Sequence, residues 1–159
     1  MSQDSEQQNS QQSSSSANAK SFKADSLLVV VDFRQDVHHA LPRAFDLVKK
    51  FGSRLTLATC VYQNIVDIIP ASSGLDWKTI RDEALAHYED ELRELAAEHC
   101  KQAMDGEAID EILENINYEV VWNKSFHHGL VNLVNRQAYD LIVKTAHHHS
   151  ALKKLFFTP

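Results

Sequence analysis

The sequence contains few cysteines and no long run of apolar residues, and both absences narrow the class of protein. Its two cysteines, Cys60 and Cys100, lie far apart, without the spacing of a metal-binding or redox motif, which predicts reduced thiols. The sequence also shows no signal-peptide pattern and no apolar stretch long enough to span a membrane. We therefore expect a cytoplasmic protein that does not associate with membranes.

Motifs for catalysis are missing as well. The chain has no Ser-His-Asp order, no paired-carboxylate context and no Walker-type glycine loop. Each of these motifs supplies a specific chemistry, such as a nucleophile with its base or a cradle for phosphates. Because nothing in the sequence supports such chemistry, we predict that the protein is not an enzyme.

The distribution of charge says more than its total. The net charge of −6 disfavours a general nucleic-acid binder. Residues 121–159, however, carry five basic side chains and a single acidic one, together with five of the nine histidines. This C-terminal quarter is therefore the part of the chain expected to attract an anion.

Composition divides the chain into a tail and one domain. Residues 1–20 contain seven serines and five glutamines, with no apolar residue larger than alanine after Met1. Such a segment buries too little apolar surface to offset its ordering entropy, so we predict a disordered tail over residues 1–22. Residues 23–159 contain enough apolar side chains for one folded domain.

Hydrophobic periodicity predicts an α/β domain with a doubly wound parallel sheet of four strands. Near-continuous apolar runs indicate a central strand at 26–32 and a last strand at 140–144 that is buried on both faces. Pro42 is expected in the first turn of a helix that stops at Gly52. The other elements follow from the same patterns: strands at 54–61 and 118–122, helices at 39–51, 77–104 and 126–136, a loop at 63–76, an acidic linker around Gly106, and a further helix after Ser150.

Several short motifs carry a family resemblance. They are Leu28-Val-Val-Val-Asp32, Gly52-Ser-Arg-Leu-Thr-Leu, Val-Val-Trp122-Asn, Asp140-Leu-Ile-Val-Lys, and Lys144-x-Ala-His-x-His-Ser followed by Phe-Thr158-Pro159. In combination these motifs resemble the universal stress protein family, and most closely the N-terminal domain of its tandem, E-type members.

The resemblance implies a five-stranded domain of the adenine-nucleotide-binding type with a role in the cytoplasmic stress response. It also implies a partner, either a second similar domain of the same chain or a second copy in a homodimer. Because the sequence ends before a fifth strand, we expect it to be truncated at its C-terminus.

The resemblance also points to candidate ligand-binding residues. Family members that bind ATP carry Gly-x2-Gly-x9-Gly-Ser/Thr after the fourth strand, and these positions hold Thr145, His148, Thr158 and Pro159 here. The missing glycines would have let backbone N–H groups approach phosphate closely. The family's aspartate at the end of the first strand, on the adenine side of the ligand, is matched by Asp32. The candidate residues of a ligand site are therefore Asp32, Thr145, His148, His149, Ser150 and Thr158.

The favoured function is a non-enzymatic stress-response domain with a degenerate nucleotide-binding loop, no required cofactor and an unknown small-molecule ligand. Ser150 is also a plausible N-cap, which by itself accounts for the residue. One alternative is a switch that binds ATP or another adenine nucleotide. A second alternative is a metal site, because the histidines at 38–39, 127–128 and 147–149 are all expected at the carboxyl edge of the sheet. Their spacing matches no metal motif, so we expect a polar rim without metal.

Overall fold

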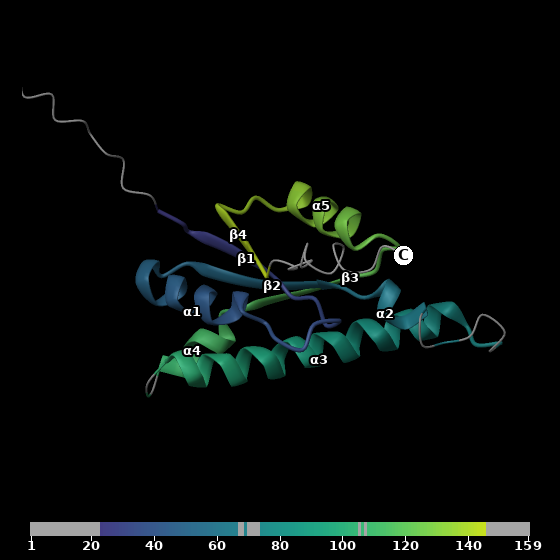
Figure 1. Cartoon of the computed structure of the whole chain (residues 1–159), viewed down its shortest axis with the longest axis horizontal. Helices are drawn as coiled ribbons and strands as arrows, with labels where there is room; N and C mark the ends of the chain where they lie inside the picture. The colour runs from purple at the N-terminus through teal and green to yellow at the C-terminus, as the bar shows by residue number, and fades with distance from the viewer. Residues whose placement is uncertain (1–22, 67–68, 70–73, 105, 107, 146–159) are drawn as a thin grey trace, which may run out of the picture.

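The computed structural model describes residues 23–66, 69, 74–104, 106 and 108–145. Within them the chain alternates strands and helices (Figure 1). The elements are β1 (Ser26–Val30), α1 (Ala40–Phe51), β2 (Arg54–Cys60), α2 (Tyr62–Val66), α3 (Trp77–Ala103), α4 (Ala108–Glu114), β3 (Asn117–Val121), α5 (Phe126–Arg136) and β4 (Leu141–Lys144).

The four strands form one parallel sheet in the order β3-β2-β1-β4. The chain first moves outward from β1 through β2 to β3, and then returns past both to place β4 on the other side of β1. The direction of winding thus reverses between β1 and β4. This confirms the predicted α/β fold with a doubly wound parallel sheet and the central position of β1.

Helices cover both faces of the sheet because the side chains of β1 alternate between them. Leu27 and Val29 pack in the core with Phe45 of α1 and Leu92 of α3. Leu28 and Val30 point to the opposite face of the sheet, where they belong to a smaller cluster with α5. Figure 1 shows the resulting layers, with α1, α3 and α4 below the sheet and α5 above it.

Helix α1 begins and ends as its sequence predicts. Pro42 lies in its first turn, where a missing N–H removes no intrahelical hydrogen bond. Gly52 follows the last residue with a φ of 65°, and its N–H donates to the carbonyl of Val48. That left-handed conformation closes the helix and is easiest for glycine.

The prediction that the last strand is buried on both faces is wrong. Leu141 and Val143 are half-buried, whereas Ile142 is 47% exposed. The apolar run Leu-Ile-Val is compatible with either arrangement, and its position next to β1 alone among the described strands decides it. The hydrophobic run therefore predicts a strand correctly, but not what covers each face.

Two short helices were missed. Helix α2 lies almost entirely in the segment expected to be a loop, and α4 lies within the expected acidic linker. The acidic residues of α4 face outward, while Ile109, Ile112 and Leu113 pack against the main core. Seven residues are too few for helical periodicity to stand out from the surrounding charge.

Candidate functional site

The point at which the winding reverses provides the site. Val30 of β1 is in register with Lys144 of β4, so the segments that follow these two strands leave the sheet at the same edge. In open α/β sheets ligands bind in the crevice at the carboxyl ends of the strands, at such a reversal of strand order. Two of the predicted site residues lie just beyond these strands: Asp32 is two residues after the end of β1, and Thr145 directly follows β4.

Asp32 is a buried carboxylate held by a residue two positions further on. Its side chain is 4% exposed. Arg34 donates from Nε to Oδ1 at 2.8 Å and from Nη2 to Oδ2 at 2.7 Å, and its backbone N–H also donates to Oδ1. A buried carboxylate without such donors would carry a large desolvation cost. Two charge-assisted hydrogen bonds in a planar fork offset that cost and fix the orientation of both groups.

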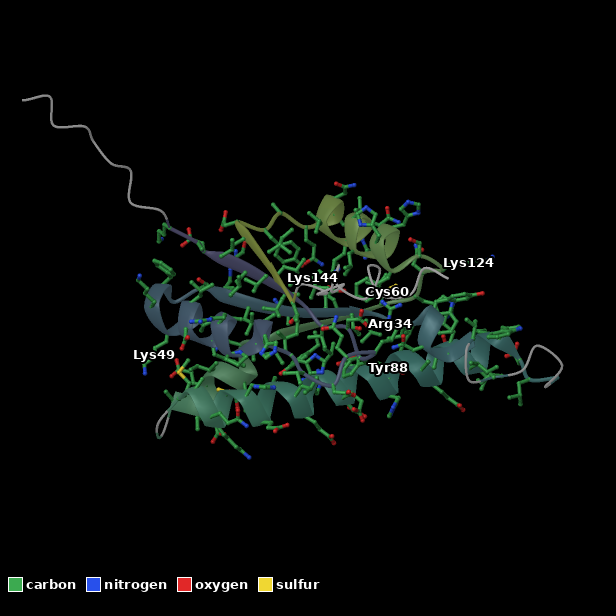
Figure 2. All side chains as sticks on the ribbon, in the orientation of Figure 1. Arg34, Lys49, Cys60, Tyr88, Lys124 and Lys144 are labelled. Carbon is green, nitrogen blue, oxygen red and sulfur yellow. The ribbon has the colours of Figure 1, made fainter. Side chains whose placement is uncertain are left out.

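Two cations at this edge, Arg34 and Lys144, share an aromatic neighbour. The guanidinium carbon of Arg34 lies 5.3 Å from the ring centroid of Phe126, the first residue of α5, and the ammonium of Lys144 lies 5.5 Å from it. Both distances are within the range of a cation–π interaction. We call Arg34, Lys144 and Phe126 the cation cluster; Figure 2 shows Arg34 and Lys144 toward the middle of the molecule, with Cys60 labelled beside them.

The side chain of Thr145 caps the N-terminus of α1 by accepting a hydrogen bond. The N–H of Ala40 donates to Thr145 Oγ1 at 3.1 Å, and the N–H of Leu41 donates to the carbonyl of His38. Pro42 has no N–H to offer. The first turn of α1 therefore has few donors left for an anion, although helix N-termini are otherwise ready-made anion sites.

Cys60 lies at the same edge, at the end of β2, but its environment is structural. Its thiol donates to the backbone carbonyl of Asn123 at 3.4 Å. Burial raises the pKa of the Cys60 thiol, against smaller opposing effects of its hydrogen bonds and of the positive charge of Arg34. Because the thiolate is the reactive form, a thiol with a raised pKa is a poor nucleophile. Cys60 is thus a buried structural residue rather than a reactive one.

His38 lies beside the site, in the segment between β1 and α1. Its ring meets Phe33 edge-on with 6.1 Å between centroids. The pKa of His38 is lowered from its usual value, first by burial and then by the positive charge of His99 on α3, while Asp32 opposes the shift. Nδ1 of His99 is itself buried without a hydrogen-bond partner in the described part of the chain.

The lowered pKa of His38 predicts that mild acid destabilises the fold. The unfolded chain binds a proton to His38 near pH 6.5, and the folded chain does so only at lower pH. Stability from neutral His38 is thus fully present above pH ~6.5 and is lost as the pH falls through the folded pKa. We expect His38→Gln to reduce the loss of unfolding free energy between pH 7.5 and 5.5, measured by urea denaturation. The exposed neighbour His39 supplies the control, and a His39→Gln variant with the same reduced loss would contradict the assignment to His38.

The structure brings together only part of the predicted site. Asp32 and Thr145 lie at the expected edge, whereas the other four candidates, His148, His149, Ser150 and Thr158, lie outside the described residues. Arg34 was missed as a site residue, although an arginine two positions after a strand-ending aspartate is a signal that could have found it. The role of Phe126 beside two cations was also missed, because its position in α5 indicated only core packing.

The described residues contain no group of three or more histidine, cysteine, aspartate or glutamate side chains that could hold a metal ion. The histidines at 147–149, on which the metal alternative rests, lie outside those residues, so the alternative stays a prediction. In the same part of the chain no helix is both long and apolar enough to cross a membrane.

An α/β fold with a doubly wound parallel sheet and polar side chains at the reversal of strand order is an architecture that many ligand-binding domains share. Comparison with known proteins identifies the family. The model of the universal stress protein family matches residues 23–159, so the chain belongs to that family. The resemblance to its E-type members is also confirmed. Over 133 residues, which are 84% of this chain and 39% of each relative, it is 27% identical to universal stress protein E of Photorhabdus laumondii and 24% identical to that of Escherichia coli K12.

The chain thus spans about two fifths of the length of these curated relatives. Among solved structures, it is similar to the crystal structure of protein Rv1636 from Mycobacterium tuberculosis H37Rv. The TM-score is 0.43 and the identity 14%, over 86% of this chain and 83% of the other.

Proposed function

We propose that this universal stress protein domain is a non-enzymatic, cytoplasmic stress-response module whose nucleotide-binding loop is degenerate. It acts by binding a small molecule or a partner domain, and it binds ATP weakly. The partner is a second domain of the same type, in a longer chain or in a homodimer. The length of the relatives, more than twice that of the match, supports this arrangement.

The observation that carries the proposal is the position of Thr145. Where the pattern of the nucleotide-binding relatives has its first glycine, this chain has a side chain whose hydroxyl is held against the first N–H of α1. A Cβ and a hydroxyl at this point fill space that a glycine leaves to a phosphate oxygen. The bidentate hold of Arg34 on Asp32 adds to this, because an adenine would have to compete for the same carboxylate.

ATP binding to the 159-residue chain is therefore expected to be weak. Each backbone N–H that reaches a charged oxygen contributes about 1.5–3 kcal/mol, so losing two weakens the affinity by roughly a hundredfold or more. The matched comparison is a variant that restores the pattern at its four positions, Thr145→Gly, His148→Gly, Thr158→Gly and Pro159→Ser. We expect titration calorimetry at pH 7.5 to show tighter ATP binding by this variant, by roughly the same factor.

Adenosine provides the control in that experiment, because it has no phosphates. Its affinity is expected to be the same for both chains. Micromolar binding of ATP by the unaltered chain would contradict the proposal, and so would a restored loop that leaves ATP binding unchanged.

A further inference from the structure

A small apolar hollow lies beside the cation cluster, on the α5 face of the sheet. Its volume is about 330 Å³, and its lining combines apolar side chains of β1, β4 and α5, such as Val30, Ile142 and Leu130, with Phe126 and Lys144. Two large apolar side chains on this face, Val131 and Ile142, are 41% and 47% exposed. The volume is at the lower end of the range for small-molecule sites.

The charge around the hollow is concentrated at one end. Phe126 and Lys144 line the hollow, and Arg34 lies over the same phenylalanine ring. Arg34 is paired with Asp32, whereas the ammonium of Lys144 has only the ring of Phe126 as a partner within the described ranges. The other acidic residue between β1 and α1, Asp36, is exposed and forms none of the ion pairs found among the described residues. One end of an apolar hollow is thus positively charged.

From this combination we propose that the hollow binds a small amphipathic carboxylate, with its hydrocarbon body between α5 and β4 and its anionic head on Lys144. Because Arg34 is paired with Asp32, the net positive charge at this end of the hollow comes from Lys144. This inference rests on the proposed function, a domain that binds ATP weakly, and adds to it the chemical class of the ligand. The hydrocarbon supplies affinity through the area it removes from water, and the charge selects an anion over a neutral or cationic amphiphile.

Octanoate and 1-octanol, which share the hydrocarbon chain and differ in the charge of the head group, test the proposal. Both are titrated into the isotope-labelled 159-residue chain at pH 7.5, and binding is followed by the backbone amide shifts of β4 and α5. Saturable binding with a dissociation constant on the order of 1 mM is expected for octanoate, given the small number of atoms it can bury. One charge-assisted hydrogen bond should make octanoate about tenfold tighter than octanol.

Lys144→Gln removes the head-group contact and should abolish that tenfold preference while leaving octanol binding unchanged. Ile142→Val reduces the apolar lining and should weaken both ligands about threefold, since it removes one methylene group from contact. Lys49→Gln is the matched control, because Lys49 is also an exposed lysine but belongs to α1, below the sheet and at the left in Figure 2. It should keep the full preference for octanoate.

The proposal is overturned if octanoate does not bind saturably, if both ligands bind equally to the unaltered chain, or if Lys144→Gln keeps the preference. A hollow filled by another part of this chain would give the first of these results. Calorimetry with ATP on the same preparation separates the two proposals. Weak ATP binding without octanoate binding contradicts only this inference. Tight ATP binding contradicts the proposed function, and the carboxylate site is then decided by whether Lys144→Gln removes the preference for octanoate.

Discussion

Replacing Phe45 with alanine is expected to lower the free energy of unfolding by about 3–5 kcal/mol, the range found when a large buried aromatic side chain is removed. Phe45 is the largest of the fully buried side chains, with 0% of its surface exposed. It packs from α1 into the main core, between the sheet and α3. The change removes apolar area from burial and leaves a cavity that the rigid sheet cannot collapse to fill.

Urea denaturation of the purified chain measures this loss. Phe51→Ala is the matched control, since Phe51 is the same residue type in the same helix but is only partly buried. We expect it to cost well under half as much, because part of its surface already contacts water. An equal loss of unfolding free energy in the two variants would show that Phe45 of α1 does not pack in the core as described.

The second large effect is expected at Gly129 of α5, where glycine is required by space rather than by backbone conformation. A Cβ at this position would lie 2.9 Å from Sγ of Cys60 and 3.1 Å from side-chain carbons of Asn123 and Val121. The neighbours belong to the ends of β2 and β3 and to the loop that follows β3, so α5 would have to move off the sheet. Gly129→Val should therefore cost about 2–3 kcal/mol, at the upper end of the range for overpacking.

The opposing contribution is helix propensity, which favours almost any residue over glycine within a helix by a few tenths of a kcal/mol to ~1 kcal/mol. Asn132→Val measures a valine on the exposed face of the same helix, where no clash arises, and it should change stability by less than ~0.5 kcal/mol. Thermal and urea unfolding of both variants provide the comparison. A Gly129→Val protein as stable as the unaltered one would mean that α5 does not pack this closely on the sheet.

Local sequence was sufficient to predict those helices and strands whose formation depends on residues only a few positions apart. The apolar run of β1 and the glycine that ends α1 act on neighbouring backbone groups, so periodicity and capping rules located these elements to within a residue or two. The order of strands and helices then limited the fold to a doubly wound sheet, because right-handed crossovers leave few other arrangements.

For the candidate site, too, the sequence predicted some features and the structure was needed for others. Asp32 and Thr145 could be named in advance because each follows a recognisable strand and matches a position of a family pattern. What these residues contact could not be named. The use of the Thr145 hydroxyl by α1 and the meeting of Lys144 with Phe126 depend on how separate segments converge. The pairing of Arg34 with Asp32 is local in the chain, but other side chains could equally have paired with that carboxylate.

The sequence alone thus determined the class of fold, the central strand and the edge at which a ligand is expected. Only the tertiary structure decided which charges at that edge are already paired, that Ile142 is exposed, and that an apolar hollow adjoins Lys144. The physical reason is how far apart in the sequence the contacting residues are. Helix and strand signals come from contacts between residues close in the chain, whereas burial, ion pairing and cavity shape come from segments such as β1, β4 and α5 that meet only when the chain folds.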